Sequence, residues 1–288
     1  MAAEMPKIGF IGAGTVGTAL AVLLSRKVYP VVAISSRSMA SAEKLARRIN
    51  GCRVIETSQG VVDTAELVFI TTPDDVIATV AAEIKWRPEN SAVHCSGAAS
   101  TDILEPARQA GARVASIHPL QTFAGVEQAI ANISGSTFAI EAEEPLLTTL
   151  QEMAASMDGV SIELKASDKV LYHAAAVMAC NYLVTLLKLS TDLWQTFSVP
   201  PKQATRALLP LIQGTINNLD KIGLPNCLTG PIARGDTGTI KKHLEALQKS
   251  APAILPTYKE LGRQTIPISL AKGKIDQKQA EELAAILK

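Results

Sequence analysis

The sequence predicts an α/β fold, in which a doubly wound and mainly parallel sheet is followed by an all-helical C-terminal region. Up to about residue 165, short apolar runs alternate with stretches of helical periodicity. Such alternation is typical of parallel strands joined by covering helices. After Ser167 the strand signals end, and the remaining segments have helical periodicity alone. We therefore expect two domains, residues 1–166 and residues 167–288.

The strands of the first domain are expected where apolar, β-branched residues occur in short runs without a helical period. Helices are expected between them, because a parallel sheet needs crossover connections that cover both of its faces. The expected strands are residues 7–11, 31–34, 52–55, 67–70, 91–96, 113–118, 137–142 and 160–165. The clearest connecting helices are residues 15–27, 41–50, 74–85 and 145–157.

The second domain is expected to be helical throughout, with prolines that bound or kink its helices. Its most apolar stretch, residues 172–187, also contains histidine, asparagine and threonine. We expect this stretch to be a buried helix rather than a membrane span. The expected helices are residues 167–190, 201–220, 238–250, 251–263 and 276–287.

The composition is that of a soluble globular protein. Of the 288 residues, 47% are hydrophobic and 19% are charged, and the formal net charge is +1. This charge gives no electrostatic basis for binding nucleic acid or an anionic membrane. The four cysteines are far apart in the sequence, and we expect them to be reduced core residues. No signal-peptide pattern is visible, so a cytoplasmic protein is expected.

A glycine-rich turn follows the first expected strand and begins the first expected helix. In that context each glycine has its own role. Gly12 permits the tight turn, Gly14 lets a pyrophosphate approach the backbone closely, and Gly17 lets the helix pack close to the strand. The helix N-terminus would offer free N–H groups to the phosphates. The alternative is a strand–turn–helix connection that binds no ligand. The predicted dinucleotide-binding residues are Gly12, Ala13, Gly14, Thr15, Val16 and Gly17.

The second expected strand ends in Ser35, Ser36 and Arg37. NAD-binding chains usually have an acidic residue there, which holds the ribose 2′-hydroxyl group. An acid would repel a 2′-phosphate, whereas hydroxyl groups and a guanidinium suit one. The cofactor is therefore predicted to be NADP(H). The alternative is that Arg37 is an ordinary exposed loop residue.

Two further turns are expected to lie beside the nicotinamide, because ligands of open parallel sheets bind beyond the carboxyl ends of the strands. We therefore count their residues as cofactor-binding. Asp74 or Asp75, by contrast, is expected to be a helix N-cap rather than a catalytic acid. The turn residues are Thr71, Thr72 and Pro73 after the fourth strand, and Ser96 and Gly97 after the fifth.

Three histidines could take part in proton transfer. His94 and His118 end the fifth and sixth expected strands, and His173 lies early in the first helix of the second domain. Their spacing matches no metal-binding signature, so no metal site is predicted. His118 is expected to contact the substrate. The alternative is that it fixes the loop before Pro119.

Polar residues interrupt the otherwise apolar helix expected at residues 167–190. Lys169 and His173 are i,i+4 neighbours on one helical face, and Asn181 lies further along the helix. Buried polar groups need either partners or a function. We predict that these three residues line a catalytic site. The alternative is that Lys169 is exposed and Asn181 is hydrogen-bonded in the core.

A Gly- and Pro-rich loop after residue 228 precedes a further helix, which Thr237 or Thr239 could cap. Arg234 in this loop suits a substrate carboxylate. We therefore predict that Arg234 and Thr237 bind substrate. The alternative is a salt-bridged turn between helices.

Six blocks of the chain, in order, resemble one bacterial family: IGFIGAGTVG, TTPDD, HCSGAAS, SIHPLQTF, YHAAAVMACNY and TGPIARGDTGTIKKHL. The family joins a Rossmann-like domain to a C-terminal helical domain of unknown function (2520-type), and the resemblance spans almost the whole chain. Its members resemble NADP-dependent oxidoreductases related to 6-phosphogluconate dehydrogenase. Ketopantoate reductase and pyrroline-5-carboxylate reductase are the functional analogues. The resemblance also implies a homodimer formed through the helical domains.

The related reductases place a catalytic lysine and a substrate-binding asparagine on the first helix after the sheet. The resemblance assigns these roles to Lys169 and Asn181. The two residues are twelve positions apart here, so the compact pair of the related enzymes is not reproduced. This departure makes His173 a second candidate for the proton donor.

The predicted function is hydride transfer between NADPH and the C=O or C=N bond of a small carboxylate-bearing metabolite, with a ketopantoate reductase as the first choice. Lys169 or His173 would donate the proton, Asn181 would hold the reacting group, and Arg234 would anchor the carboxylate. The alternatives are an imine reductase of the pyrroline-5-carboxylate type, a prephenate-type dehydrogenase, and a regulatory protein that binds NADP without turnover.

Overall fold

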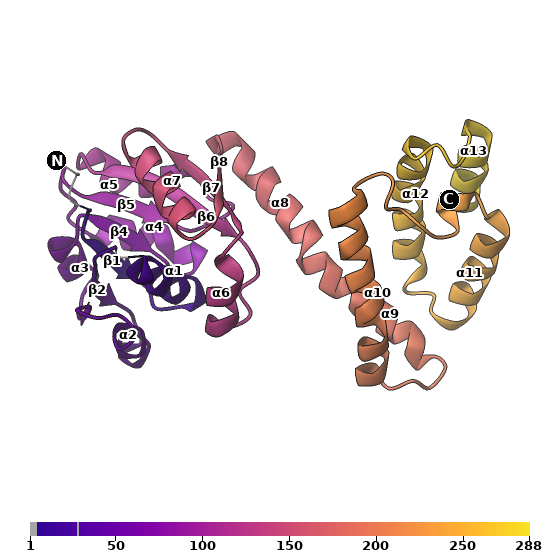
Figure 1. The fold of residues 1–288 in the computed structure, drawn as a ribbon, viewed down its shortest axis with the longest axis horizontal. Helices are drawn as coiled ribbons and strands as arrows, with labels where there is room; N and C mark the ends of the chain where they lie inside the picture. Colours follow the sequence, from indigo (N-terminus) through magenta and orange to yellow (C-terminus); the bar gives the residue numbers. More distant parts are fainter. Residues whose placement is uncertain (1–4, 28) are drawn as a thin grey trace. The chain divides into compact units, whose positions relative to one another are not determined.

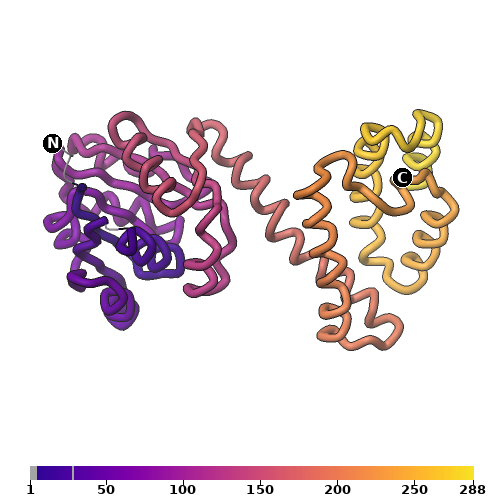
Figure 2. The backbone as a smooth tube through the Cα atoms, viewed as in Figure 1, coloured from indigo at the N-terminus to yellow at the C-terminus, as the bar shows by residue number. Residues whose placement is uncertain are grey.

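The structure, a computed structural model, describes residues 5–27 and 29–288. Residues 1–4 of the predicted first domain therefore lie outside the described residues, as does Val28. The chain forms two compact units, Met1–Cys180 and Asn181–Lys288. Figure 2 follows it from the indigo and magenta strands and helices of the first unit to the orange and yellow helices of the second.

The two units divide later in the chain than the predicted boundary after residue 166. The cause is the helix α8 (Lys169–Ala179), which belongs to the first unit. Its first residue, Lys169, is buried against the sheet. The end of the last strand therefore does not mark the end of the first unit.

The first unit is built on one eight-stranded sheet (Figure 1). Its strands are β1 (Ile8–Ile11), β2 (Val31–Ser35), β3 (Arg53–Val54), β4 (Leu67–Ile70), β5 (Ser91–His94), β6 (Arg113–Leu120), β7 (Thr137–Ala142) and β8 (Val160–Glu163). The order across the sheet is β3-β2-β1-β4-β5-β6-β7-β8. All neighbours are parallel except β6 and β7, which pair antiparallel. The predicted α/β class, the mainly parallel sheet and each expected strand are confirmed.

Helices cover both faces of this sheet and close two hydrophobic cores. They are α1 (Thr15–Arg26), α2 (Met39–Ala46), α3 (Ser58–Thr64), α4 (Asp74–Glu83), α5 (Glu105–Gln109), α6 (Val126–Ile133) and α7 (Leu146–Ser156). Side chains alternate between the two faces along a strand. In β1, Phe10 therefore contributes to one core, with α1, α2, α6 and α7, and Ile11 to the other, with α3, α4 and α5.

The second unit is helical, as predicted. It contains α9 (Asn181–Gln195), α10 (Pro201–Ile222), the short 3-10 helix η3 (Ile232–Arg234), α11 (Thr237–Ser250), α12 (Leu255–Ala271) and α13 (Gln277–Ile286). Ile240, Ile266 and Leu283 are central to its small core. The single helix expected at residues 167–190 is broken at Cys180, where φ is −109° and ψ is −65°, so α8 and α9 are separate helices.

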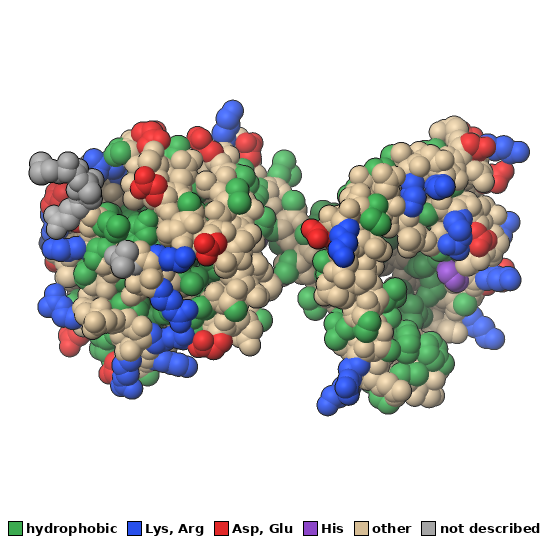
Figure 3. Space-filling view, viewed as in Figure 1, with side chains coloured by type: hydrophobic (Ala, Val, Ile, Leu, Met, Phe, Trp, Pro, Cys, Tyr) green, Lys and Arg blue, Asp and Glu red, His purple; other side chains and the backbone are tan. Residues whose placement is uncertain are grey.

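The segment Ala166–Gln195 is, among the described residues, the one stretch long and apolar enough to cross a membrane by length and composition alone. The expectation that residues 172–187 form a buried helix is wrong for this single chain: Met178 is 67% exposed and Val184 is 68% exposed. Leu211 on α10 is 67% exposed. Figure 3 shows apolar side chains gathered over α9 and α10. These two helices therefore present apolar surface that no described residue covers.

Candidate functional site

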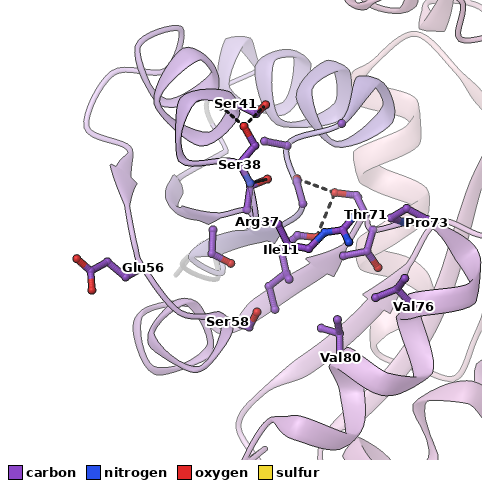
Figure 4. Close-up of a pocket in the computed structure, with 16 residues that line it drawn as sticks. Ile11, Arg37, Ser38, Ser41, Glu56, Ser58, Thr71, Pro73, Val76 and Val80 are labelled. Carbon is purple, nitrogen blue, oxygen red and sulfur yellow. Dashed lines mark hydrogen bonds between the residues drawn. The ribbon is translucent and has the colours of Figure 1, made fainter.

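A cavity of about 450 Å³ lies at the carboxyl ends of β1, β2 and β4 (Figure 4). It brings together the glycine turn, the end of the second strand and the turn after the fourth, which are far apart in the sequence but adjacent at this edge of the sheet. Its lining residues are Ile11, Gly12, Ala13, Gly14, Ser35, Ser36, Arg37, Ser38, Ser41, Glu56, Ser58, Thr71, Thr72, Pro73, Val76 and Val80. Thr15, Val16 and Gly17 continue from the same turn into α1.

The glycine turn packs tightly against the end of β4. Gly12 has a φ of +111°, which L side chains rarely adopt, and a Cβ atom there would lie 2.7 Å from the Thr71 carbonyl oxygen. A Cβ atom on Gly17 would lie 2.3 Å from Thr71 Oγ1 and 2.7 Å from the carbonyl oxygen of Gly12. The Thr71 hydroxyl group donates a hydrogen bond to that carbonyl at 2.9 Å. Both glycines are therefore required by close packing.

Gly14 differs, because a Cβ atom there would meet no atom within 4 Å. The space beside it belongs to the cavity. No side chain caps the first turn of α1, and that turn contains no acidic residue, so its N–H groups face no competing anion. The open space at Gly14 and these N–H groups suit a pyrophosphate.

Two buried hydroxyl groups in the cavity wall have no hydrogen-bond partner among the described residues. They are Ser35 Oγ and Thr72 Oγ1. A buried polar atom without a partner costs about 1–3 kcal/mol, and a bound polar ligand would remove that cost. The cavity therefore fits a ligand that brings both phosphates and further polar groups, as a dinucleotide does.

Arg37 lies at the rim of the cavity and is exposed. Within residues 5–27 and 29–288, its guanidinium makes no ion pair or side-chain hydrogen bond. Glu56, which sequence analysis did not identify, also lines the cavity, but its carboxylate points away from the other labelled side chains (Figure 4). Arg37 is thus free to meet an anionic ligand beside Ser36 and Ser38.

Substitution by alanine is expected to have different effects at Gly17 and at Gly14. Gly17→Ala should lower the free energy of unfolding by about 1–3 kcal/mol, because a methyl group there overlaps packed atoms. Gly14→Ala should change stability by less than about 0.5 kcal/mol, since its φ of −76° is ordinary, and should weaken NADPH binding roughly tenfold or more by filling the space left for phosphate. Urea unfolding and NADPH titration would measure the two effects. Unchanged NADPH affinity in Gly14→Ala would exclude a phosphate there.

A second polar cluster lies beyond β5 and β6. A Cβ atom on Gly97 would lie 2.6 Å from His173 Cδ2 and 2.9 Å from His118 Nε2. The His118 and His173 rings meet edge to face, with centroids 6.0 Å apart. His118 Nδ1 is hydrogen-bonded to the Tyr172 hydroxyl group at 2.8 Å. The structure therefore brings Gly97, His118 and His173 together and adds Tyr172 to them.

The electrostatics of this cluster favour neutral groups. Burial, assisted by the nearby His173 and Lys169, lowers the pKa of His118 to about 4. Burial raises the pKa of the Tyr172 phenol to about 12. At neutral pH the pair is therefore a neutral imidazole and a protonated phenol, joined by a hydrogen bond.

His94 is fully buried and has a structural role. Its Nδ1 accepts a hydrogen bond from the Ser96 N–H at 3.1 Å, so the proton is on Nε2, which lies 3.2 Å from the Ser100 carbonyl oxygen. Burial, followed in size by the positive charge of Lys169, lowers its pKa to about 4. His94 thus fixes the loop that carries Ser96 and Gly97.

Asp74 is not the N-cap that the sequence suggests. It is the first residue of α4, where Pro73 occupies the N-cap position and no side chain caps the helix. The Asp74 carboxylate instead accepts a hydrogen bond of 2.6 Å from the Ser96 hydroxyl group, which also accepts the Ala99 N–H at 3.1 Å. This bond joins the turn after β4 to the turn after β5, both predicted to lie beside the nicotinamide.

Lys169, one helical turn before His173 on α8, is 2% exposed. Its ammonium group donates a hydrogen bond to Ser116 Oγ of β6 and lies 3.5 Å from Glu141 Oε2 of β7. It is therefore neither exposed nor unpartnered. Glu141 was missed by sequence analysis, although a carboxylate within the apolar strand TFAIEA was an available signal.

The remaining predicted site residues belong to the second unit. Asn181 begins α9, Arg234 ends η3 and Thr237 begins α11. The cap of α11 is Asp236, which accepts the Thr239 N–H at 2.9 Å, so neither threonine is the cap. The catalytic or substrate-binding roles of these residues stay predictions.

No group of three or more His, Cys, Asp or Glu side chains among the described residues is arranged to hold a metal ion.

Two family descriptions match the chain. A Rossmann-like domain matches residues 2–119, and the domain of unknown function DUF2520 matches residues 136–265. No curated protein sequence matches it. The two matches together span the sheet and much of the helical region.

Solved structures share this fold. A candidate NADP oxidoreductase from Bacteroides fragilis is 25% identical, with 91% of this chain and 98% of that chain covered and a TM-score of 0.70. A protein from Thermotoga maritima is also 25% identical, with coverage of 96% and 98% and a TM-score of 0.64. A pyrroline carboxylate reductase from Plasmodium falciparum, solved with NADP bound, is 14% identical, with coverage of 99% and 100% and a TM-score of 0.61. By its two family matches, the chain therefore joins a Rossmann-like domain to a C-terminal DUF2520 domain.

Proposed function

We propose that the protein is an NADP(H)-dependent oxidoreductase that transfers a hydride between the nicotinamide and the C=O or C=N bond of a small carboxylate-bearing metabolite. The observation that carries the proposal is the cavity at the ends of β1, β2 and β4. It combines open space at Gly14, two unpartnered buried hydroxyl groups and a free guanidinium on Arg37. The related structures are an NADP oxidoreductase candidate and an NADP-bound reductase, which supports the same cofactor.

The residues around the cavity would each hold one part of the cofactor. The glycine turn and the first turn of α1 would bind the pyrophosphate, and Ser36 with Arg37 would bind the 2′-phosphate. Thr72 and Pro73 line the same cavity on its β4 side, where the nicotinamide half would pass towards Ser96 and Gly97. Bound NADPH supplies the hydride.

His173 is our choice for the proton donor. It is half-buried and lies against Gly97 at the end of β5, whereas Lys169 is enclosed and already bonded to Ser116 and Glu141. A donor must come within hydrogen-bond reach of the atom that it protonates. His118 would contact the substrate beside His173.

The roles predicted for three residues of the second unit belong to the same proposal. In this proposal Asn181 holds the reacting group, and Arg234 with Thr237 binds the carboxylate, because a guanidinium pairs well with that group. A cytoplasmic location belongs to the same proposal.

The substrate class is tested by the loss of NADPH absorbance with two probes. 2-Dehydropantoate is the keto-acid probe, and 1-pyrroline-5-carboxylate is the cyclic imine probe. Turnover of the first alone would support a ketopantoate reductase, and turnover of the second alone an imine reductase. NADPH binding without turnover of these or related keto acids and imines, prephenate included, would favour a regulatory protein.

We further propose that the protein is a homodimer formed through its helical region. The supporting observation is the uncovered apolar surface of α9 and α10, which includes Val184 and Leu211. Stable interfaces bury about 1,200–2,000 Å² in total, and a soluble monomer rarely exposes a large continuous apolar patch.

The dimer can be broken by charge. Light scattering of the wild type should give twice the 30.4 kDa chain mass. Val184→Glu and Leu211→Glu should each shift the protein towards the monomer, because an unpaired charge in an apolar interface is costly. Val160→Glu, at an exposed apolar position of β8, is the control and should leave the mass unchanged. A monomeric wild type would contradict the proposal.

A further inference from the structure

We infer that Glu141 and Lys169 form a positioning pair, which fixes α8 on the sheet and thereby sets Tyr172 and His173 against His118 and Gly97. The inference rests on the proposed function, since it concerns the histidine cluster assigned to proton transfer. It gives Glu141, a residue outside the predicted site, a defined task, and it gives Lys169 a task other than proton donation.

Glu141 is held between two elements. Its side chain is 13% exposed. It accepts hydrogen bonds from the Thr101 N–H at 3.1 and 3.2 Å and from the Thr101 hydroxyl group at 2.9 Å. Its other contact is the Lys169 ammonium, 3.5 Å away. One carboxylate therefore ties the 3-10 turn η1 (Thr101–Leu104), which follows β5, to the first residue of α8.

The pairing of β6 with β7 places two side chains beside the Lys169 ammonium group. Ser116 of β6 and Glu141 of β7 are directly opposite each other in the antiparallel ladder, so their side chains lie on the same face of the sheet. Ser116 is fully buried and accepts from Lys169. Lys169 thus meets a hydroxyl group and a carboxylate from neighbouring strands, and its position is fixed by both.

The burial of Lys169 makes this pairing necessary. Burial lowers the pKa of its ammonium group, and the charge and hydrogen bond of Glu141 oppose that shift. A buried ammonium without a partner is strongly destabilising. Without the Glu141 carboxylate, Lys169 would lose its proton or leave its place, and the first turn of α8 would move with it.

The position of Lys169 determines where the next turn of α8 places Tyr172 and His173. Tyr172 and His173 follow Lys169 by one turn and lie on the same side of α8. Tyr172 bonds His118, and His173 lies against Gly97. Neither Glu141 nor Lys169 lines the cavity assigned to the cofactor, so neither would touch the reacting atoms there. They act through the residues that follow them.

The test compares Glu141→Gln with Glu163→Gln in the full-length protein. Glu163 is an exposed carboxylate on the neighbouring strand β8, where it pairs with Ile140, and serves as the matched control. Glu141→Gln should leave the dissociation constant of NADPH within about twofold and lower kcat about 10–100-fold with whichever probe the wild type reduces, since small displacements of reacting groups cost this much. It should also shift the imidazole NMR signals of His118 and His173. Glu163→Gln should change none of these.

A double-mutant cycle with Lys169→Met identifies the pair. If the two residues act as a unit, Glu141→Gln combined with Lys169→Met should be no worse than Lys169→Met alone, because removing both charges leaves no buried ion unpaired. The double variant also provides a folded comparison if Glu141→Gln alone unfolds. Additive losses would overturn the inference, as would unchanged histidine signals in Glu141→Gln.

The histidine signals separate this inference from the proposed function. They need no turnover, and the chain contains only four histidines, so each can be followed. If the wild type reduces no probe but Glu141→Gln still shifts His118 and His173, the positioning pair stands and the proposed reaction fails. If the wild type turns over and Glu141→Gln matches it in kcat and in spectra, the reaction stands and the pair fails.

Discussion

Replacing Arg37 with alanine is expected to weaken NADPH binding about 10–100-fold while leaving the weaker binding of NADH unchanged. A charge-assisted hydrogen bond to phosphate contributes about 1.5–3 kcal/mol, and 1.4 kcal/mol is a factor of ten in affinity. Arg37 is exposed at the cavity rim and has no competing partner among the described residues, so its loss should act on the ligand rather than on the fold. Calorimetric titration with both nucleotides measures the effect.

Arg47→Ala is the matched control for this experiment. Arg47 follows α2 closely, is exposed, and pairs with Glu43 outside the cavity lining. The substitution Arg47→Ala removes the same positive charge from the same region, so it measures the general effect of charge on nucleotide affinity. Equal losses in the two variants would show that Arg37 makes no specific contact with the 2′-phosphate. Equal binding of NADPH and NADH by the wild type would contradict the interpretation of Ser35, Ser36 and Arg37.

Replacing His173 with alanine is expected to lower kcat about 10²–10⁴-fold, the usual contribution of a positioned general acid. NADPH affinity should remain nearly unchanged, because His173 does not line the cofactor cavity. Steady-state kinetics of NADPH oxidation measure the first effect, and titration measures the second. Lys169→Ala should also lower turnover, but by displacing α8, and it should lower stability as well because it leaves Glu141 without its cation.

His243 offers a control for the loss of an imidazole. It lies on α11 in the second unit and bonds the Tyr258 hydroxyl group at 2.8 Å, which repeats the His118–Tyr172 arrangement at an exposed position. His243→Ala should leave kcat within about twofold. Wild-type kcat in His173→Ala would remove His173 as the donor and transfer that role to the Tyr172–His118 pair beside it.

The fold was predictable because its signals are local. Each strand is a short apolar run and each helix has its own period, so all eight strands were found from residues within a few positions of one another. The break at Cys180 and the later division between the units were not found. Residues 167–190 form one continuous apolar pattern that contains no sign of either, and the burial of Lys169 depends on Ser116 and Glu141, which are distant in the sequence.

The same distinction applies to the site. The glycine turn and Ser35–Arg37 are contiguous motifs with a known ligand chemistry, so the sequence indicated them directly. The roles of Asp74, Glu141 and Tyr172 were missed because they depend on partners 22, 40 and 54 positions away in the sequence: Ser96 for Asp74, Thr101 for Glu141, and His118 for Tyr172. The apolar strand around Glu141 marks that carboxylate as unusual, but no local pattern identifies Lys169 or Thr101 as its partner.

The antiparallel pairing of β6 and β7 also limits how the chain can change in length. The ladder places Glu141 opposite Ser116, whatever the length of the connection through α6 that joins the two strands. Insertions in that connection would therefore leave the Glu141 carboxylate in place. A single residue inserted within β7 before Glu141 would turn every later side chain of the strand to the other face of the sheet. The chain should thus tolerate insertions and deletions up to residue 136, where the connection ends, and tolerate them much less from there to Glu141.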